Sequence, residues 1–200
     1  MTEGRPTLRS LMALPETPAP LSTSALVLID CQNTYREGIM QLEGVEPALA
    51  ECAKLLQRAR DVGARVIHIQ HDAGPGTPYD VRAPIGEIAG VVAPKAGETV
   101  ITKSYPSSFE QTTLDAELKR SGVADLVLVG FMTHMCVNST ARAAFNHGYR
   151  TSVVGNATAT RALASPAGGV LSAQEVHNGA LTALADMFAI VVPSGEKIPV

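Results

Sequence analysis

The chain is most constrained by an alternation between short apolar runs and longer segments with helical spacing of apolar residues. The first run, Ala25 to Asp30, is apolar up to its last residue, which is typical of a strand buried on both faces. Residues 45–59 then carry apolar side chains at helical spacing, and Gly63 ends that segment. Since strands alternate with helices, the sequence predicts a parallel sheet.

The same alternation continues to the end of the chain. The predicted strands are 25–30, 65–70, 99–103, 124–130, 149–154 and 188–192, and the predicted helices are 45–59, 112–121, 133–147 and 172–186. Right-handed crossovers make this order a doubly wound, Rossmann-like α/β fold, a six-stranded parallel sheet with helices on both faces. Residues 71–98 are rich in Pro and Gly and predict a long loop, which in a compact domain is often functional.

Length and composition limit the possible domain organisation. With 200 residues the chain is long enough for one domain with a full hydrophobic core. Its 46% hydrophobic and 18% charged residues argue against disorder. We therefore predict an extended N-terminal arm over residues 1–24 and a single domain over residues 25–200.

Charge and cysteine usage exclude several classes of function. The net charge of −3 and the dispersed Lys and Arg residues argue against a nucleic-acid partner. No apolar run reaches the ~18 residues of a membrane span, so no membrane partner is expected. Residues 1–24 lack the pattern of a secretory signal. Three Cys, an odd number, do not make a disulfide framework, so we expect a cytoplasmic protein.

Three reactive residues follow three of the predicted strands. Asp30 ends the first strand, Lys103 ends the third, and Cys136 lies in the turn after the fourth. Because ligands bind beyond the carboxyl ends of parallel strands, we expect these side chains to converge at one edge of the sheet. Lys103 and a helix N-terminus would favour the thiolate of Cys136, and Asp30 could accept its proton. The pattern predicts a nucleophilic thiol site.

Each of these residues also has an ordinary structural interpretation. An Asp at a strand end is often a cap, a lone Lys is usually a surface charge, and a lone Cys is usually a small buried hydrophobe. Cys52 fits the last description, because it lies on the apolar stripe of the first helix. Cys31 should point away from Asp30 by strand alternation. We therefore expect Cys136 to be the most reactive of the three thiols.

Several segments together resemble the motifs of the isochorismatase-like cysteine hydrolases. The first is Leu28-Ile-Asp-Cys-Gln-Asn33, the second is Ile101-Thr-Lys103 followed by Ser107-Ser-Phe109, and the third is Gly130-Phe-Met-Thr-His-Met-Cys-Val137 followed by Thr140-Ala-Arg142. They occur in the family's order, and the resemblance runs over residues 22–192. Together these motifs are specific, although each one alone would be weak.

The resemblance implies a catalytic triad of Asp30, Lys103 and Cys136 that needs no cofactor. It also implies a cis peptide bond between Phe131 and Met132, and an oxyanion hole made by the N–H groups of Met132 and Cys136. The expected reaction is cysteine-dependent cleavage of a C–N bond in a small amide, ureido or carbamoyl compound, by way of a thioester. A small-molecule substrate is the expected partner.

Two departures from the family's patterns limit the expected reaction and substrate class. Nicotinamidases of the superfamily place metal-binding Asp and His residues after the second strand. Here His68 and His71 are three apart on an extended chain and should point to opposite faces, so we expect no metal site. Isochorismatases proper cleave a vinyl ether, and resemblance to them would predict a non-nucleophilic residue at position 136, where this chain has Cys136.

Specificity and assembly are predicted from the remaining features. The expected substrate-binding residues are the aromatic and polar side chains near the motifs: Tyr35, Phe109, Phe131, His134 and Gln32. The mean hydropathy of +0.13 and the few charges in segment 172–186 predict a homo-oligomer, a dimer or tetramer.

Two alternative functions stay open, and a third is disfavoured. The chain could be a catalytically idle small-molecule binding protein on the same fold, or a vinyl ether hydrolase of the isochorismatase type. A dinucleotide-dependent oxidoreductase is disfavoured, because residues 31–44 lack G-x-G-x-x-G.

Overall fold

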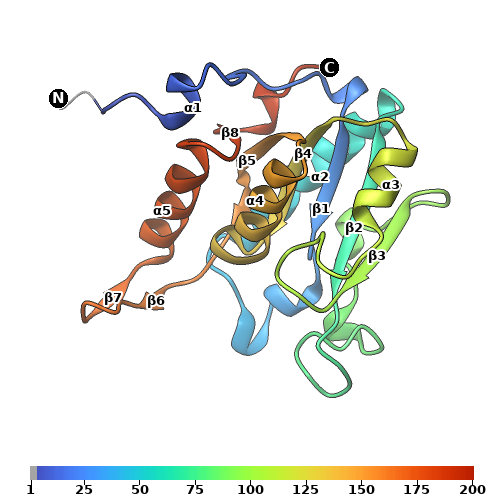
Figure 1. Cartoon of the computed structure of the whole chain (residues 1–200). Coiled ribbons are helices and arrows are strands. Elements are labelled where there is room, and N and C mark those ends of the chain that lie inside the picture. Colours follow the sequence, from blue (N-terminus) through green and yellow to red (C-terminus); the bar gives the residue numbers. More distant parts are fainter. Residues whose placement is uncertain (1–3) are drawn as a thin grey trace.

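Six parallel strands form the central sheet of the computed structural model, which describes residues 4–200 (Figure 1). They are β1 (Ala25–Ile29), β2 (Arg65–His71), β3 (Thr99–Lys103), β4 (Asp125–Phe131), β5 (Arg150–Ala159) and β8 (Ile190–Val192). Their order is β3-β2-β1-β4-β5-β8, so the chain starts in the middle and winds first to one edge and then to the other. This confirms the doubly wound fold and puts the switch point between β1 and β4.

Helices cover both faces of the sheet (Figure 1). On one face α2 (Val45–Asp61) packs through Leu49 and Leu56 against one side of β1 and β4. On the other face lie α3 (Leu114–Arg120), α4 (Asn138–Asn146) and α5 (Ala173–Ala185). All five residues of β1 are buried, alternately towards the two layers, which explains why that run is apolar without interruption.

The structure differs from the predicted boundaries in two places beside the carboxyl edge of the sheet. The segment expected to be one helix over 133–147 starts with a π-helical turn, Thr133–Val137, and α4 begins only at Asn138. β5 runs to Ala159 because, after a register irregularity between Leu128 and Gly130, it rejoins β4 through Thr158 and Ala159. Both departures lie next to the nucleophile candidate.

The N-terminal segment is not uniformly extended, contrary to the prediction for residues 1–24, of which 1–3 lie outside the described part. It contains α1 (Leu8–Leu11), whose first turn is capped by the side chain of Thr7. The guanidinium of Arg9 is buried and donates to the carbonyl of Met187 at 2.9 Å. This contact ties α1 to the chain just after α5.

The long loop after β2 is held at two points. At its end, Glu98 accepts two hydrogen bonds from Arg60 of α2, at 2.7 and 2.9 Å, and contacts Nε2 of His68 at 3.0 Å. Near its middle, the amide of Gln32 donates to the carbonyl of Gly86 at 2.7 Å. The loop is therefore an ordered wall beside the carboxyl ends of β1 and β2.

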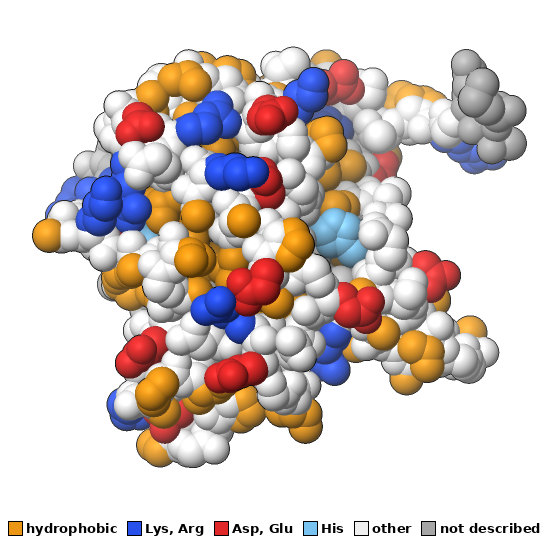
Figure 2. All heavy atoms as spheres, turned by 180° about the vertical axis from the view of Figure 1, so that it is seen from behind, with side chains coloured by type: hydrophobic (Ala, Val, Ile, Leu, Met, Phe, Trp, Pro, Cys, Tyr) orange, Lys and Arg blue, Asp and Glu red, His pale blue; other side chains and the backbone are white. Residues whose placement is uncertain are grey.

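A small hairpin and a mixed surface complete the molecule. The hairpin consists of β6 (Leu163–Ala164) and β7 (Val170–Leu171), which pair antiparallel ahead of α5 and project from the body (Figure 1). On the face shown in Figure 2, Lys and Arg side chains lie interspersed with Asp and Glu. No helix within residues 4–200 is both long and apolar enough to cross a bilayer.

Candidate active site

Asp30, Lys103 and Cys136 meet beyond the carboxyl ends of the central strands. Nζ of Lys103 lies 2.7 Å from Oδ2 of Asp30 and 3.3 Å from Sγ of Cys136. All three residues are buried, with exposed fractions of 0%, 2% and 5%. A carboxylate, an ammonium and a thiol are thus in mutual contact and shielded from water.

Close approach of two strand ends builds this cluster. Gly130 has a φ of +109°, and a Cβ there would lie 2.0 Å from the carbonyl oxygen of Ile29. Only glycine lets the end of β4 come so close to the end of β1. The next residue after β1, Asp30, has a φ of +50° and is fixed by its N–H, which donates to the carbonyl of Ile69 at 3.0 Å.

His71 is a fourth member of the cluster that sequence reasoning missed. Nζ of Lys103 lies 3.1 Å from Nδ1 of His71. A lysine ammonium has N–H donors and no acceptor, so His71 must be the acceptor in this contact, beside the ion pair with Asp30 and the hydrogen bond to Cys136. His71 ends β2 as Lys103 ends β3, but only the sheet register shows that the two residues are partners.

Burial determines the protonation of the two acidic groups. It raises the pKa of the Asp30 carboxyl, and the positive charge of Lys103 opposes that shift. Burial and the negative charge of Asp30 raise the pKa of the Cys136 thiol to about 12, again against Lys103. The thiolate that Lys103 and a helix N-terminus were expected to favour is thus not the resting form, because desolvation and the carboxylate outweigh them.

Backbone hydrogen bonds fix the turn that carries Cys136. The peptide bond between Phe131 and Met132 is cis. The N–H groups of Met135 and Val137 both donate to the carbonyl of Met132, at 3.0 and 3.2 Å. The second of these bonds spans five residues and makes the turn wider than an α-helical one.

Two side-chain hydrogen bonds connect the same turn to its neighbours. Oγ1 of Thr133 lies 3.0 Å from Nδ1 of His177 in α5. Nδ1 of His134 forms a hydrogen bond with Oγ1 of Thr160, just after β5. The turn that carries Cys136 is therefore held by α5 and by the segment after β5.

Three of the five residues expected to bind substrate surround the cluster. The ring of Tyr35 packs edge-on against Phe131, with centroids 5.6 Å apart, and against Tyr79 of the long loop, at 5.8 Å. Tyr79 in turn packs edge-on against His71 at 5.0 Å. His134 is half-buried beside the nucleophile turn. These residues form an aromatic wall around one side of the cluster.

The other two expected substrate contacts are corrected by the structure. The Gln32 side chain is fully buried, and its amide forms hydrogen bonds with the backbone. It donates to the carbonyls of His71 and Gly86 and accepts from the N–H of His71. The Phe109 ring stacks on His147 and Tyr149, near the amino end of β5. Gln32 is therefore a loop anchor, and Phe109 is a packing residue distant from the carboxyl edge.

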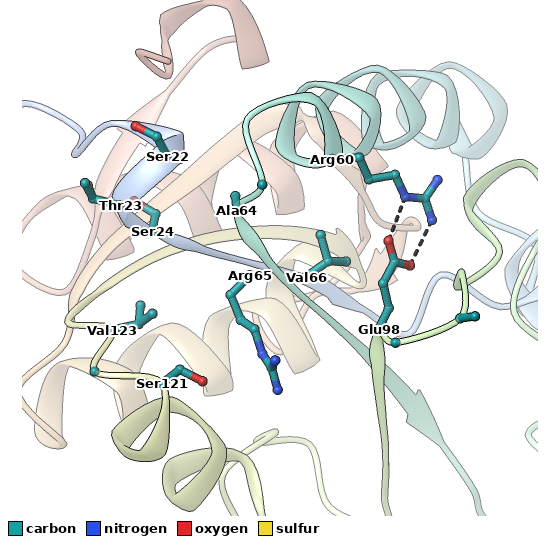
Figure 3. Close-up of a pocket in the computed structure, with 14 residues that line it drawn as sticks. Ser22, Thr23, Ser24, Arg60, Ala64, Arg65, Val66, Glu98, Ser121 and Val123 are labelled. Carbon is teal, nitrogen blue, oxygen red and sulfur yellow. Dashed lines mark hydrogen bonds and ion pairs between the residues drawn. The ribbon is translucent and has the colours of Figure 1, made fainter.

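One large cavity does not belong to this cluster. It has a volume of about 810 Å³ and lies at the amino ends of the strands, and the paired side chains of Arg60 and Glu98 form part of its lining (Figure 3). A smaller cavity of about 270 Å³ lies at the carboxyl edge, and Thr160 and His177 contribute to its lining. Since those two residues contact the turn that carries Cys136, the smaller cavity lies beside that turn, although none of Asp30, Lys103 and Cys136 lines it.

The described residues offer no ready-made metal centre. Within residues 4–200, no group of three or more His, Cys, Asp or Glu side chains is arranged to hold an ion. His68 and His71 lie apart as expected: His68 contacts Glu98 and His71 contacts Lys103.

Comparison with known proteins identifies the family. The family model described as "Isochorismatase domain" matches residues 24–196. The chain therefore belongs to the isochorismatase family, and the resemblance seen in its motifs is confirmed.

Two relatives match nearly the whole chain. A secreted isochorismatase effector of Verticillium dahliae is 35% identical over 189 residues, covering 94% of this chain and 97% of the relative. The crystal structure of an isochorismatase from Pseudomonas putida superposes with a TM-score of 0.93 at 37% identity, covering 96% of this chain and 99% of the other. Because one relative is secreted, the cytoplasmic location stays a prediction.

Other relatives carry names that state a reaction. A maleamate amidohydrolase of Pseudomonas putida is 34% identical over 148 residues, covering 65% of this chain and 69% of the relative. A ureidoacrylate amidohydrolase of Stutzerimonas stutzeri is 30% identical over 185 residues, covering 72% and 75%.

The charge balance of the cluster yields a test at Cys136. Because Asp30 raises the pKa of the thiol and Lys103 lowers it, Asp30→Asn should speed alkylation of Cys136 by iodoacetamide at pH 8, and Lys103→Met should slow it. We expect changes of about tenfold in each direction, each tenfold corresponding to about one pKa unit. Peptide mass spectrometry after timed alkylation measures the rates, and a slower reaction in Asp30→Asn would contradict the charge assignment.

Proposed function

We propose that this protein is a cysteine-dependent hydrolase that cleaves a C–N bond in a small amide, ureido or carbamoyl compound through a thioester. The observation that carries the proposal is the buried contact of Lys103 with both Asp30 and Cys136. The proposal is supported by the names of the relatives, which include a maleamate and a ureidoacrylate amidohydrolase. Both names describe hydrolysis at nitrogen.

The first step moves one proton inside the cluster. When a substrate carbonyl reaches Cys136, the thiol gives its proton to Asp30 and the sulfur attacks the carbonyl carbon. The negative charge leaves the carboxylate as the sulfur acquires it, and Lys103 contacts both atoms, so the charge beside the ammonium stays constant. This exchange lets a buried thiol with a pKa of about 12 act near neutral pH.

The later steps return the proton. The tetrahedral oxyanion is held by the N–H groups of Met132 and Cys136, an arrangement often worth about 3 kcal/mol per donor. As the C–N bond breaks, Asp30 protonates the departing nitrogen and leaves a thioester on Cys136. A water molecule then gives a proton to Asp30 and attacks the thioester, and Asp30 hands that proton back to the sulfur as the acid product leaves.

The two alternative functions are less consistent with the same geometry. A binding protein without catalysis would bury a carboxylate and an ammonium at a cost in desolvation and gain nothing from the adjacent thiol. A vinyl ether hydrolase needs a proton donor but no nucleophile, whereas Cys136 is within reach of both Asp30 and Lys103.

The direct test of this function is a screen with matched variants. Incubation with a panel of small amides, ureides and carbamoyl acids should release ammonia or amine from at least one compound, and Cys136→Ser should reduce kcat by at least about a thousandfold. Cys52→Ser is the matched control, since that thiol is buried against Ala157 and should retain activity. Prolonged chelation should leave the rate unchanged. An active Cys136→Ala variant would overturn the proposal.

His71 acts on this reaction through Lys103, as a positioning residue. It can accept the third N–H of the ammonium only when its ring is neutral, and both burial and Lys103 lower its pKa. Asp30 and Asp72 oppose that shift, and Tyr79 covers the ring. In the acidic range two protonations therefore stop turnover, one at Asp30 and one at His71.

This role predicts a specific pH profile. In a plot of log kcat against pH, the wild type should show a slope of about 2 at low pH. His71→Asn keeps a hydrogen-bond acceptor but does not titrate, so its slope should be about 1. His71→Ala should lower kcat by about tenfold with KM nearly unchanged. His147→Asn, distant from the cluster, is the control. Equal slopes in wild type and His71→Asn would show that His71 is only a packing residue.

We also propose that the protein assembles as a homo-oligomer through α5. This helix has one Asp or Glu and no Lys or Arg, yet only Ala173 and Leu184 of its 13 residues are buried. The hairpin before it exposes Val170 (71%) and Leu171 (41%). Such a face is typical of a subunit contact.

Light scattering at micromolar concentration should therefore show a dimer or tetramer. Ala183→Glu, which puts a charge on the exposed side of α5, should shift the protein to monomer, whereas Ile39→Glu in an exposed turn should not. A monomeric wild-type protein would contradict the assembly.

A further inference from the structure

Helix α5 contacts the turn that carries Cys136 at both of its ends. At the first residue of the turn, Oγ1 of Thr133 lies 3.0 Å from Nδ1 of His177. Directly after the last residue of the turn, Nδ2 of Asn138 donates to the carbonyl of Ala180 at 3.3 Å. His177 and Ala180 are three positions apart on α5, which lies beside α4 (Figure 1), so both belong to the same face of the helix. One helix face therefore holds the turn at its start and at its end.

The contact at the end of the turn is supported by a further side chain. Nε of Arg142 donates to Oδ1 of Asn138 at 2.7 Å, so the amide is held by its oxygen while its nitrogen reaches α5. The guanidinium of Arg142 also lies over the ring of Phe188, 4.1 Å from the ring centroid. Arg142 belongs to the third sequence motif but does not touch the catalytic cluster. Its contacts connect the chain after α5, through α4, to the turn.

The contact at the start of the turn is not explained by hydrophobic packing. Thr133 is fully buried, so its hydroxyl needs a hydrogen-bond partner, and His177 provides one. In α5 only Ala173 and Leu184 are buried, and His177 is half-buried. A threonine hydroxyl can donate or accept, so the hydrogen bond can form whether the imidazole is neutral or charged. The imidazole therefore serves the turn more than it serves the core.

We propose that His177 is a positioning residue for the cysteine reaction, which through Thr133 holds the N–H groups of Met132 and Cys136 where the oxyanion forms. Thr133 directly follows Met132 and lies three residues before Cys136, so a displacement of Thr133 moves both donors. Such donors act fully only within about 0.5 Å of the productive geometry, and a displacement of about 1 Å can cost about a hundredfold in rate. This inference rests on the function proposed above and adds a residue that acts on the reaction through the turn.

The kinetic test removes the contact from either side, with the panel compounds that the wild type hydrolyses. His177→Leu and Thr133→Val should each lower kcat by about tenfold and leave KM within about twofold, because the oxyanion exists only in the transition state and the intermediate. The double variant should also lose about tenfold, since both changes remove the same contact. His177→Asn keeps a polar atom near the place of Nδ1 and should recover most of the loss. Asn178→Leu, at an exposed position of the same helix, is the control and should match wild type.

A second measurement does not depend on turnover. The N–H groups of Met135 and Val137 both donate to the carbonyl of Met132, so their amide hydrogen exchange reports opening of the turn. In His177→Leu and Thr133→Val this exchange should be about tenfold faster than in wild type, and in His177→Asn close to wild type. Exchange in β1 should be the same in all of these proteins. Faster exchange in β1 together with the turn would show a general loss of stability and contradict the positioning role.

The outcomes separate the two proposals. Hydrolysis that depends on Cys136 but keeps the wild-type kcat in His177→Leu overturns the positioning role and leaves the cysteine mechanism standing, and so does a loss of kcat that His177→Asn does not reverse. An active Cys136→Ala variant overturns the cysteine mechanism, whereas the contact of α5 with the turn stands if exchange is faster in His177→Leu and restored in His177→Asn. If no panel compound is hydrolysed, unchanged exchange in His177→Leu overturns the inference and faster exchange supports it.

Discussion

The site depends on one buried ammonium group that is shared among three acceptors. Nζ of Lys103 forms an ion pair with Asp30, donates a hydrogen bond to Cys136 and lies within hydrogen-bond distance of Nδ1 of His71. One cation in a dry environment can stabilise one neighbouring anion well but not two. The carboxylate and the thiol therefore compete for a single negative charge, and in the proposed reaction a proton passes between them before the sulfur attacks. Burial raises the pKa of the thiol most, and this competition raises it further.

The order of the strands explains why a lysine occupies this position. Lys103 ends β3 and Asp30 follows β1, with β2 between them. Neighbouring strands are about 4.8 Å apart, so the side chain must extend over roughly 10 Å of sheet to reach the carboxylate. A long, unbranched side chain suits this reach, and it passes over the last residue of β2, which is His71. The histidine contact thus follows from topology: any residue at the end of β2 would lie beneath this lysine, and an imidazole supplies an acceptor there.

The sequence was sufficient to predict the fold and the convergence of Asp30, Lys103 and Cys136, because both depend on local patterns. Continuous apolar runs identify strands buried on both faces, and reactive residues at their ends must lie at one edge. What sequence reasoning missed depends on register or on side-chain partners. The contact of His71 with Lys103 could be predicted only from the pairing of β2 with β3. The roles of Gln32 and Phe109 could be predicted only from the backbone carbonyls and aromatic rings that they contact. The π-helical turn at Thr133–Val137 has the same apolar spacing as an α-helix at this length, so periodicity could not separate them.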